Sequence, residues 1–285
     1  MASDAATGLR LRDMTAEDLA AAHALSREVR WPHRLEDWEL MFRVGLGVVA
    51  ESDAGVVGTV MGFPYGSTMA TLGMVIVSGD LRSQGLGRRL MEEMMRRLAP
   101  RTIQLNATES GLALYKSLGF RTVGSIHQHQ GAAFSPPMAK LRKGERVRPV
   151  SASELAAIAE LDRRATGFER PELLRLVQKQ AQGVVLDRGG VAAGFALFRR
   201  FGHGYVVGPV VAPDRDGART LIAHWLGSQA GMFIRVDVPG DSGLGDWLQD
   251  LGLEEVDRVV TMRRGEDPPT SEDAAAYAVV SQALG

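Results

Sequence analysis

Cysteine is absent from this sequence, and its absence excludes several kinds of chemistry at once. A chain without cysteine forms no disulfide, binds no metal through thiolates and forms no cysteinyl acyl-enzyme. Long apolar runs are missing as well: no stretch approaches the roughly 20 residues that a membrane-spanning helix needs, and no apolar signal segment is present near the N-terminus. We therefore expect a cytoplasmic protein that has no membrane partner.

A large excess of charge is also missing. The 33 basic residues balance 34 acidic ones and leave a net charge of −1, so nothing indicates nucleic acid as a partner. Nearly all of the basic residues are arginine, which is typical of a GC-rich bacterial genome. His127 and His129 alternate in an HQHQ segment, but no third ligand accompanies them, so we expect no metal site.

Residues 73–98 are the most informative segment, because an apolar run ends at a turn with two glycines and an amphipathic helix follows. Gly85 and Gly87 allow the turn to direct its backbone N–H groups toward one point, and free amides at a helix start attract anions. Arginines crowd the same end, where the helix dipole disfavours cations unless an anion lies between them. The turn therefore predicts a pyrophosphate site, formed by Arg82, Ser83, Gln84, Gly85, Leu86, Gly87 and Arg88.

The spacing of this turn excludes two common phosphate loops. The dinucleotide fingerprint requires a third glycine where the chain has Leu90, and the nucleoside triphosphate loop requires lysine followed by serine or threonine. The pattern that remains is RxxGxG, from Arg82 to Gly87. On its own, this pattern is equally compatible with an ordinary glycine-rich turn flanked by solvated arginines.

A second segment supports the first. Residues 102–108 (TIQLNAT) predict another strand, and residues 110–120 predict a short helix that ends at Gly119. The RxxGxG turn, followed at this distance by ALYKSLGF, resembles the GNAT (Gcn5-related) N-acetyltransferase family. The resemblance implies acetyl-CoA as the cosubstrate.

The resemblance also implies roles for particular residues. Tyr115 would be the general acid, and the backbone amides of Val75, Ile76 and Val77 would hold the pantetheine arm and polarise the thioester carbonyl. A tyrosine that only packs on the sheet is the alternative reading of Tyr115.

The activity implied is direct transfer of an acetyl group from acetyl-CoA to a primary amine of a small molecule, with Tyr115 protonating the departing thiolate and no metal involved. Two alternatives stay open. The chain would be a non-catalytic acetyl-CoA sensor or regulatory module, or it would acetylate peptide N-termini or lysines.

The general base is not evident. The predicted strand at residues 74–77 has no acid, and Asn106 carries an amide, which takes no proton. We therefore expect Asn106 to hydrogen-bond the pantetheine or the acceptor. Glu109, Glu36 and Asp37 are candidates for a base that acts through a water.

The segment WPHRLEDW, residues 31–38, follows the first predicted helix, where the family places its acceptor-binding elements. Its aromatic and acidic side chains would form a pocket for a cationic amine, with Trp31, Glu36 and Asp37 binding the substrate. The equally weighted alternative places both tryptophans in the core or an interface.

The chain also repeats itself. LRDMTAEDLAAAHALSR from Leu11 aligns with VRPVSASELAAIAELDR from Val147, and the later strands follow in the same order. In the second copy, Asp214 and Asp216 lie where a pyrophosphate would bind, and no tyrosine matches Tyr115. We therefore expect a degenerate copy without acetyl-CoA.

We predict an α/β protein of two tandem GNAT-like domains, each a mixed, mostly antiparallel twisted sheet flanked by helices. Residues 8–132 would form the catalytic domain, residues 133–146 a linker with two prolines and a basic cluster, and residues 147–285 the degenerate domain. Two such sheets paired within one chain imitate a dimer, so we expect a monomer or a homodimer. The second half would cover the first or complete its acceptor pocket.

Overall fold

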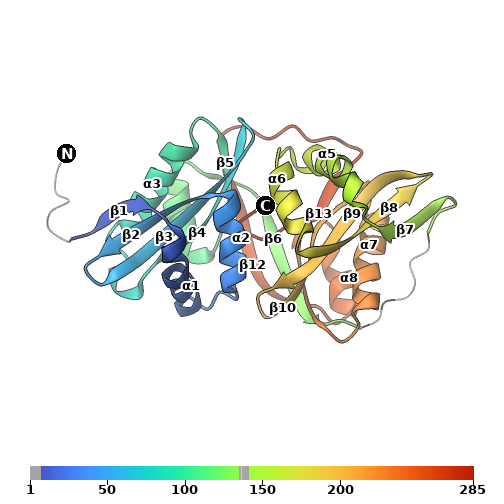
Figure 1. The fold of residues 1–285 in the computed structure, drawn as a ribbon, viewed down its shortest axis with the longest axis horizontal. Helices are drawn as coiled ribbons and strands as arrows, with labels where there is room; N and C mark the ends of the chain where they lie inside the picture. The colour runs from blue at the N-terminus through green and yellow to red at the C-terminus, as the bar shows by residue number, and fades with distance from the viewer. Residues whose placement is uncertain (1–7, 135, 137–140) are drawn as a thin grey trace.

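A computed structural model describes residues 8–134, 136 and 141–285 of the chain. Two halves lie side by side, and both contribute to one 13-stranded sheet (Figure 1). Twelve of the strands follow one another in the order β1-β2-β3-β4-β5-β12-β6-β11-β10-β9-β8-β7, and β13 pairs with β10. None of the described helices is both long and apolar enough to cross a bilayer.

The predicted repeat is confirmed, because the same series of elements occurs in both halves. The first half consists of β1 (Arg10–Asp13), η1 (Ala16–Asp18), α1 (Leu19–Glu28), α2 (Leu35–Val44), β2 (Leu46–Ser52), β3 (Gly55–Tyr65), β4 (Met69–Val77), η2 (Gly79–Leu81), α3 (Leu86–Leu98), β5 (Thr102–Ala107), η3 (Glu109–Gly111), α4 (Leu112–Ser117) and β6 (Arg121–Ala132). The second half consists of β7 (Glu145–Pro149), η4 (Ala152–Glu154), α5 (Leu155–Thr166), α6 (Pro171–Gln178), β8 (Ala181–Arg188), β9 (Val191–Phe201), β10 (Gly204–Ala212), α7 (Arg215–Ser228), β11 (Phe233–Pro239), α8 (Gly245–Asp250), β12 (Glu254–Arg264) and β13 (Ala275–Ala278).

The halves exchange their last long strands. β12 of the second half pairs with β5 of the first half, and β6 of the first half pairs with β11 of the second. β6 and β12 also pair with each other in antiparallel fashion at the centre of the sheet. This arrangement resembles an isologous dimer interface within one chain. A division of the sequence near residue 132 is therefore not a division of the sheet.

The core is shared as well. Trp38 on α2 and Leu173 on α6 are buried in one hydrophobic cluster that contains side chains from both halves. α3 covers the other face of the first half, where Leu86, Leu90 and Met94 recur at helical spacing and are buried. Packing of α1, α2, α5 and α6 around a common core therefore joins the halves on the face opposite α3.

β4 separates from its neighbour part-way along its length. The parallel ladder with β5 ends at the pair Leu72 and Leu105. Just beyond, Met74 has a φ of 53°, the register with β3 shifts, and the Thr59 hydroxyl donates to the Met74 carbonyl at 2.8 Å. The last residues of β4 thus lie beside an opening that β5 has left, and the chain continues from there into α3.

Candidate functional site

The turn before α3 leaves a series of backbone N–H groups free. Gly85 precedes the helix with a φ of 81°, and no atom lies within 4 Å of the position that a Cβ would take there. The first bond into the helix is donated by the amide of Arg89 to the Gly85 carbonyl, at 3.1 Å. Within the described chain, the amides of residues 83–88 have no backbone acceptor. The predicted anion site therefore has open donors.

Two side chains of the turn hold its shape. The Arg82 guanidinium donates to the Val77 carbonyl at 3.2 Å, and the Gln84 amide donates to the Asp80 carbonyl at 3.0 Å. Arg88 donates to the Ser117 hydroxyl at 2.6 Å, which links the start of α3 to α4. These bonds fix the turn without occupying its amides, so the residues present fit a pyrophosphate group.

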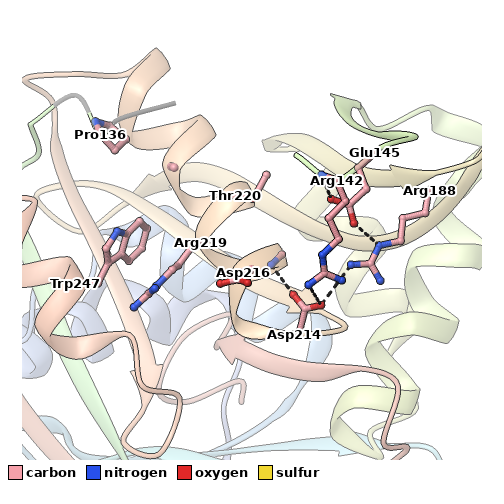
Figure 2. A pocket seen from close by; sticks show the side chains of 11 residues that line it. Pro136, Arg142, Glu145, Arg188, Asp214, Asp216, Arg219, Thr220 and Trp247 are labelled. Carbon is pink, nitrogen blue, oxygen red and sulfur yellow. Dashed lines mark hydrogen bonds and ion pairs between the residues drawn. The ribbon is translucent and has the colours of Figure 1, made fainter. Parts of the chain in front are cut away.

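The second half closes the corresponding helix start internally. The Asp214 carboxylate accepts a hydrogen bond from the Gly217 amide at 2.8 Å and caps α7. Figure 2 shows Arg142 and Arg188 directed at the same carboxylate, with N···O distances of 3.1 and 3.4 Å. The hollow at this place has a volume of about 380 Å³, and the Asp214 carboxylate occupies one of the amide donors that an anion would need.

Tyr115 lies on α4 beside the predicted cofactor site. Its ring packs edge-on against Phe120, with centroids 6.2 Å apart, and against Gly111, where a Cβ would lie 2.6 Å from the ring. Within the described residues its hydroxyl has no hydrogen-bond partner. Burial raises the pKa of Tyr115 to about 12, so the phenol stays protonated at neutral pH. This state suits a proton donor, and the catalytic role remains a prediction.

The predicted strand residues Val75, Ile76 and Val77 form the end of β4. Beyond Leu72, β4 no longer pairs with β5, and Ile76 and Val77 pair with Thr59 and Gly58 on β3. They connect the anion-binding turn to the acceptor side of the sheet.

A cavity of about 300 Å³ lies next to this opening, and we call it the acceptor cavity. Its walls come from β4, β5, the α1–α2 connection, β6, β12, β11, the end of β9 and the final segment of the chain. The lining residues are Arg30, Trp31, Pro32, His33, Leu72, Gly73, Met74, Asn106, Thr108, Gln128, Gln130, Phe201, Arg235, Val256, Asp257, Gln282 and Ala283. A larger hollow of about 690 Å³ elsewhere does not touch β4.

Of the predicted substrate-binding residues, only Trp31 lines the acceptor cavity. Glu36 is exposed on α2 and does not line it. Asp37 is buried, and its carboxylate accepts bonds from the Arg34 guanidinium at 2.9 and 3.2 Å and from the Gly202 amide at 3.2 Å. Both lie outside this cavity because the segment forms a helix, in which Asp37 caps the first turn, and their substrate-binding role stays a prediction. Trp38 is fully buried in the shared core.

Asn106 lines the acceptor cavity, but both ends of its amide are engaged. The amide nitrogen donates to the Gln282 carbonyl at 2.7 Å, and the amide oxygen accepts from the Thr261 hydroxyl at 2.8 Å. Asn106 thus holds β12 and the final segment in place. Its binding of the pantetheine or the acceptor stays a prediction, which would require one of these bonds to be exchanged. Glu109, a candidate base, lies on η3 and does not line the cavity.

Sequence reasoning missed most of the cavity wall. Gln128 and Gln130 line it while His127 and His129 face the other side of β6, as alternation along a strand requires. In the HQHQ segment, the glutamines rather than the histidines therefore indicate the cavity wall. Among the described residues there is no group of three or more His, Cys, Asp or Glu side chains that could hold a metal ion.

Comparison with known proteins gives a consistent result. Two family models, both described as an acetyltransferase (GNAT) domain, match residues 44–122 and residues 158–278. The uncharacterized N-acetyltransferase YitH of Bacillus subtilis is 25% identical over 280 residues, which covers 94% of this chain and 96% of YitH. Holothin acyltransferase of Pseudoalteromonas sp. is 26% identical over 272 residues, which covers 90% of this chain and 87% of that protein. A structure described as an acetyltransferase from Pyrococcus horikoshii has a TM-score of 0.80 at 20% identity and covers 98% of this chain and 96% of that one.

Proposed function

Since this chain belongs to the GNAT acetyltransferases and carries two GNAT domains in tandem, we propose that it transfers the acetyl group of acetyl-CoA to a primary amine of a small molecule. The first half would carry out the chemistry. The second half would bind no acetyl-CoA and would form part of the acceptor site.

The observation that carries this proposal is the continuity of three features: the free amides of residues 83–88, the separated end of β4, and the acceptor cavity beside Met74. A pyrophosphate on the turn directs the rest of coenzyme A along β4 toward the cavity. The cavity's size, about 300 Å³, and its walls from both halves favour a small acceptor over a peptide chain.

The chemistry follows from the residues in place. Acetyl-CoA supplies an acetyl group that is already activated as a thioester. Amides at the end of β4, near Val75, would donate to the carbonyl oxygen and stabilise the charge that develops there. An uncharged amine in the cavity would attack the carbonyl carbon, and the C–S bond would break as the C–N bond forms. The nitrogen would release its extra proton to water, from which Tyr115 would regain the proton that it donates, and no covalent enzyme intermediate is required.

Tyr115 would donate its proton to the departing thiolate. Its raised pKa, about 12, means that the phenol is almost entirely protonated at neutral pH. Because a thiol has a pKa of about 8.5, the thiolate leaves without obligatory protonation, so the donor accelerates the reaction without being indispensable.

The test is the release of free CoA thiol from acetyl-CoA with a panel of small amines, compared with peptides that carry a free N-terminus or a lysine. We expect turnover with at least one small amine and little with the peptides. Acetyl-CoA binding without turnover would identify a sensor instead, and preferred use of peptides would replace the small-molecule acceptor.

A further inference from the structure

The floor of the acceptor cavity carries polar side chains at paired positions on three neighbouring strands. Asp257 on β12 pairs with Gln128 on β6, which pairs in turn with Asp237 on β11, and Gln130 pairs with Arg235. Gln128, Arg235 and Asp237 are only 9%, 8% and 1% exposed. Buried polar groups on a sheet face are costly unless they are satisfied, so the donors and acceptors that lack a partner within this band show what a ligand would have to supply.

The amides in this band form a chain. Gln282 donates to the Gln128 amide oxygen at 3.5 Å, and Gln128 donates to the Gln130 amide oxygen at 2.9 Å. The amide nitrogen of Gln130 and the amide oxygen of Gln282 remain at the two ends of the chain. These groups are neutral, so any selection for charge comes from the ionic side chains around them.

Arg235 is the cation that reaches this band. Two of its nitrogens donate to Asp237 at 2.8 and 2.6 Å, and the described residues accept no bond from its third nitrogen, Nη1. Its guanidinium carbon lies 5.3 Å from the centroid of the Phe201 ring. Both Arg235 and Phe201 line the acceptor cavity, so the guanidinium is available at its β11 end.

A second buried guanidinium lies beside the same ring. Arg199 is 4% exposed, and its guanidinium carbon lies 5.0 Å from the Phe201 centroid. Its nearest described carboxylate, Asp37, is 3.8 Å away and already accepts shorter bonds from Arg34. The Nε atom of Arg199 has no partner among the described residues.

The ionic side chains around Phe201 are three guanidiniums and two carboxylates. Four of these five groups are buried, and their charges balance. The guanidiniums belong to Arg34, Arg199 and Arg235, and the carboxylates to Asp37 and Asp237. His33, which also lines the cavity, adds no charge, because burial lowers its pKa to about 4. Its Nδ1 atom also has no partner within the described chain. Arg34 is 25% exposed, and the exposed Arg30 and Asp257 on the cavity wall carry opposite charges, so there is no net buried charge. What favours an anion is the free Nη1 of Arg235, because Arg235 lines the cavity and a guanidinium N–H donates well to an anionic oxygen.

The opposite side of the cavity is where acetyl transfer would take place. Met74 lies on β4, and β5, β12 and β6 separate β4 from β11 in the sheet. An acceptor that places its amine near Met74 therefore has its far end toward Arg235.

We propose that the acceptor is an amine that also carries an anionic group, which Arg235 binds at the β11 end of the acceptor cavity. The amine lies toward Met74. This inference rests on the proposed acetyl transfer. A carboxylate and a phosphonate share the required chemistry, since both accept bonds from a guanidinium.

The experiment compares straight-chain amino acids with the corresponding amino amides and amino phosphonates of equal length as acceptors, by release of CoA thiol. We expect kcat/KM for an anionic acceptor to exceed that for its amide by about tenfold or more, and the better anion identifies the natural group. Equal or better use of the amides would overturn the proposal.

Two variants test the role of Arg235. The double variant Arg235→Gln, Asp237→Asn removes both buried charges together, and Arg235→Lys keeps the positive charge as a second variant. We expect the double variant to bring the ratio of kcat/KM for the acid to kcat/KM for the amide close to one, and Arg235→Lys to keep an intermediate ratio. Arg200→Gln, an exposed neighbour on β9, is the matched control and should keep the full ratio. An unchanged ratio in the double variant would also overturn the proposal.

Calorimetry with CoA present separates this inference from the proposed function. If no amine turns over but acids still bind more tightly than amides, the catalytic proposal fails and the anion site stands. If amines turn over but acids and amides bind equally tightly, the anion site fails and the acetyl transfer stands.

Discussion

The two halves begin the same helix in opposite ways. α3 follows Gly85, and the amides of residues 83–88 have no backbone acceptor in the described chain. α7 follows Asp214, whose carboxylate accepts from the Gly217 amide at 2.8 Å. The helix dipole is the same in both cases, so a single side chain at the helix start decides whether the anion comes from a ligand or from the protein itself.

The difference extends to the acceptor side. The second half has lost its anion site, but it supplies Phe201, Arg235 and Asp257 to a cavity beside β4 of the first half. The exchanged strand β12 carries Asp257 there. One half thus holds the groups for the cosubstrate, and the other provides much of the wall for the acceptor.

Gly85→Glu is expected to have the largest effect, because it would make the first half resemble the second. A side chain at a φ of 81° is strained, and its carboxylate would lie where the pyrophosphate binds. We expect acetyl-CoA affinity to fall by about 100-fold or more in calorimetry. Gly231→Glu is the control, since Gly231 has the same φ of 81° and equal open space in the other half. Unaltered affinity in Gly85→Glu would refute the assignment of the turn.

Tyr115→Phe tests a residue that the second half lacks. The variant keeps the ring that packs on Phe120 and removes only the proton donor. We expect kcat to fall by about 100-fold while the affinity for acetyl-CoA stays near normal. Tyr277→Phe on β13 is the matched control. A kcat equal to that of the unmodified enzyme would show that Tyr115 only packs.

Asp214→Ala would open the helix start of the second half. Loss of the cap should destabilise the protein by about 1 kcal/mol, measured as a lower midpoint of denaturation. Asp216→Ala is the control, because Asp216 is exposed and makes no hydrogen bond to the described residues. We expect the affinity of the first half for acetyl-CoA to stay constant. Binding of a second equivalent of acetyl-CoA would mean that the Asp214 carboxylate alone prevents the second half from binding this cosubstrate.

The pH dependence should show the smallest effect. Burial raises the pKa of Tyr115 to about 12, so its protonated form persists well above the ordinary tyrosine pKa of about 10. We expect no loss of kcat from this group as the pH rises through 10. A decline near pH 10 that disappears in Tyr115→Phe would indicate an exposed phenol with an ordinary pKa.

The glycine turn before α3 and the repeat could be predicted from the sequence because their signals are local. The glycines of RxxGxG, the apolar run before them and the spacing of Leu86, Leu90 and Met94 specify a strand, a turn and a helix without distant partners. The sequence also predicted that Asp214 would disfavour a phosphate, since a carboxylate repels another anion.

The acceptor cavity could not be predicted in the same way, because strand pairing between the halves brings it together. Asp257 and Gln128 are neighbours only because β12 and β6 pair. Likewise, Asn106 is engaged by Thr261 and by Gln282, which are remote in sequence. Asp37 was expected to bind substrate because it lies close to aromatic residues in the sequence. The same sequence also fits the start of a helix, in which Asp37 forms an ion pair with Arg34.

The exchanged strands β6 and β12 make it difficult to separate the two halves of this enzyme into fragments. A fragment that stops after β6 would retain β5 with a bare edge and would keep β6 without either of its neighbours. The polypeptide should therefore melt in a single cooperative step, and separately expressed pieces should be insoluble or should recombine with each other.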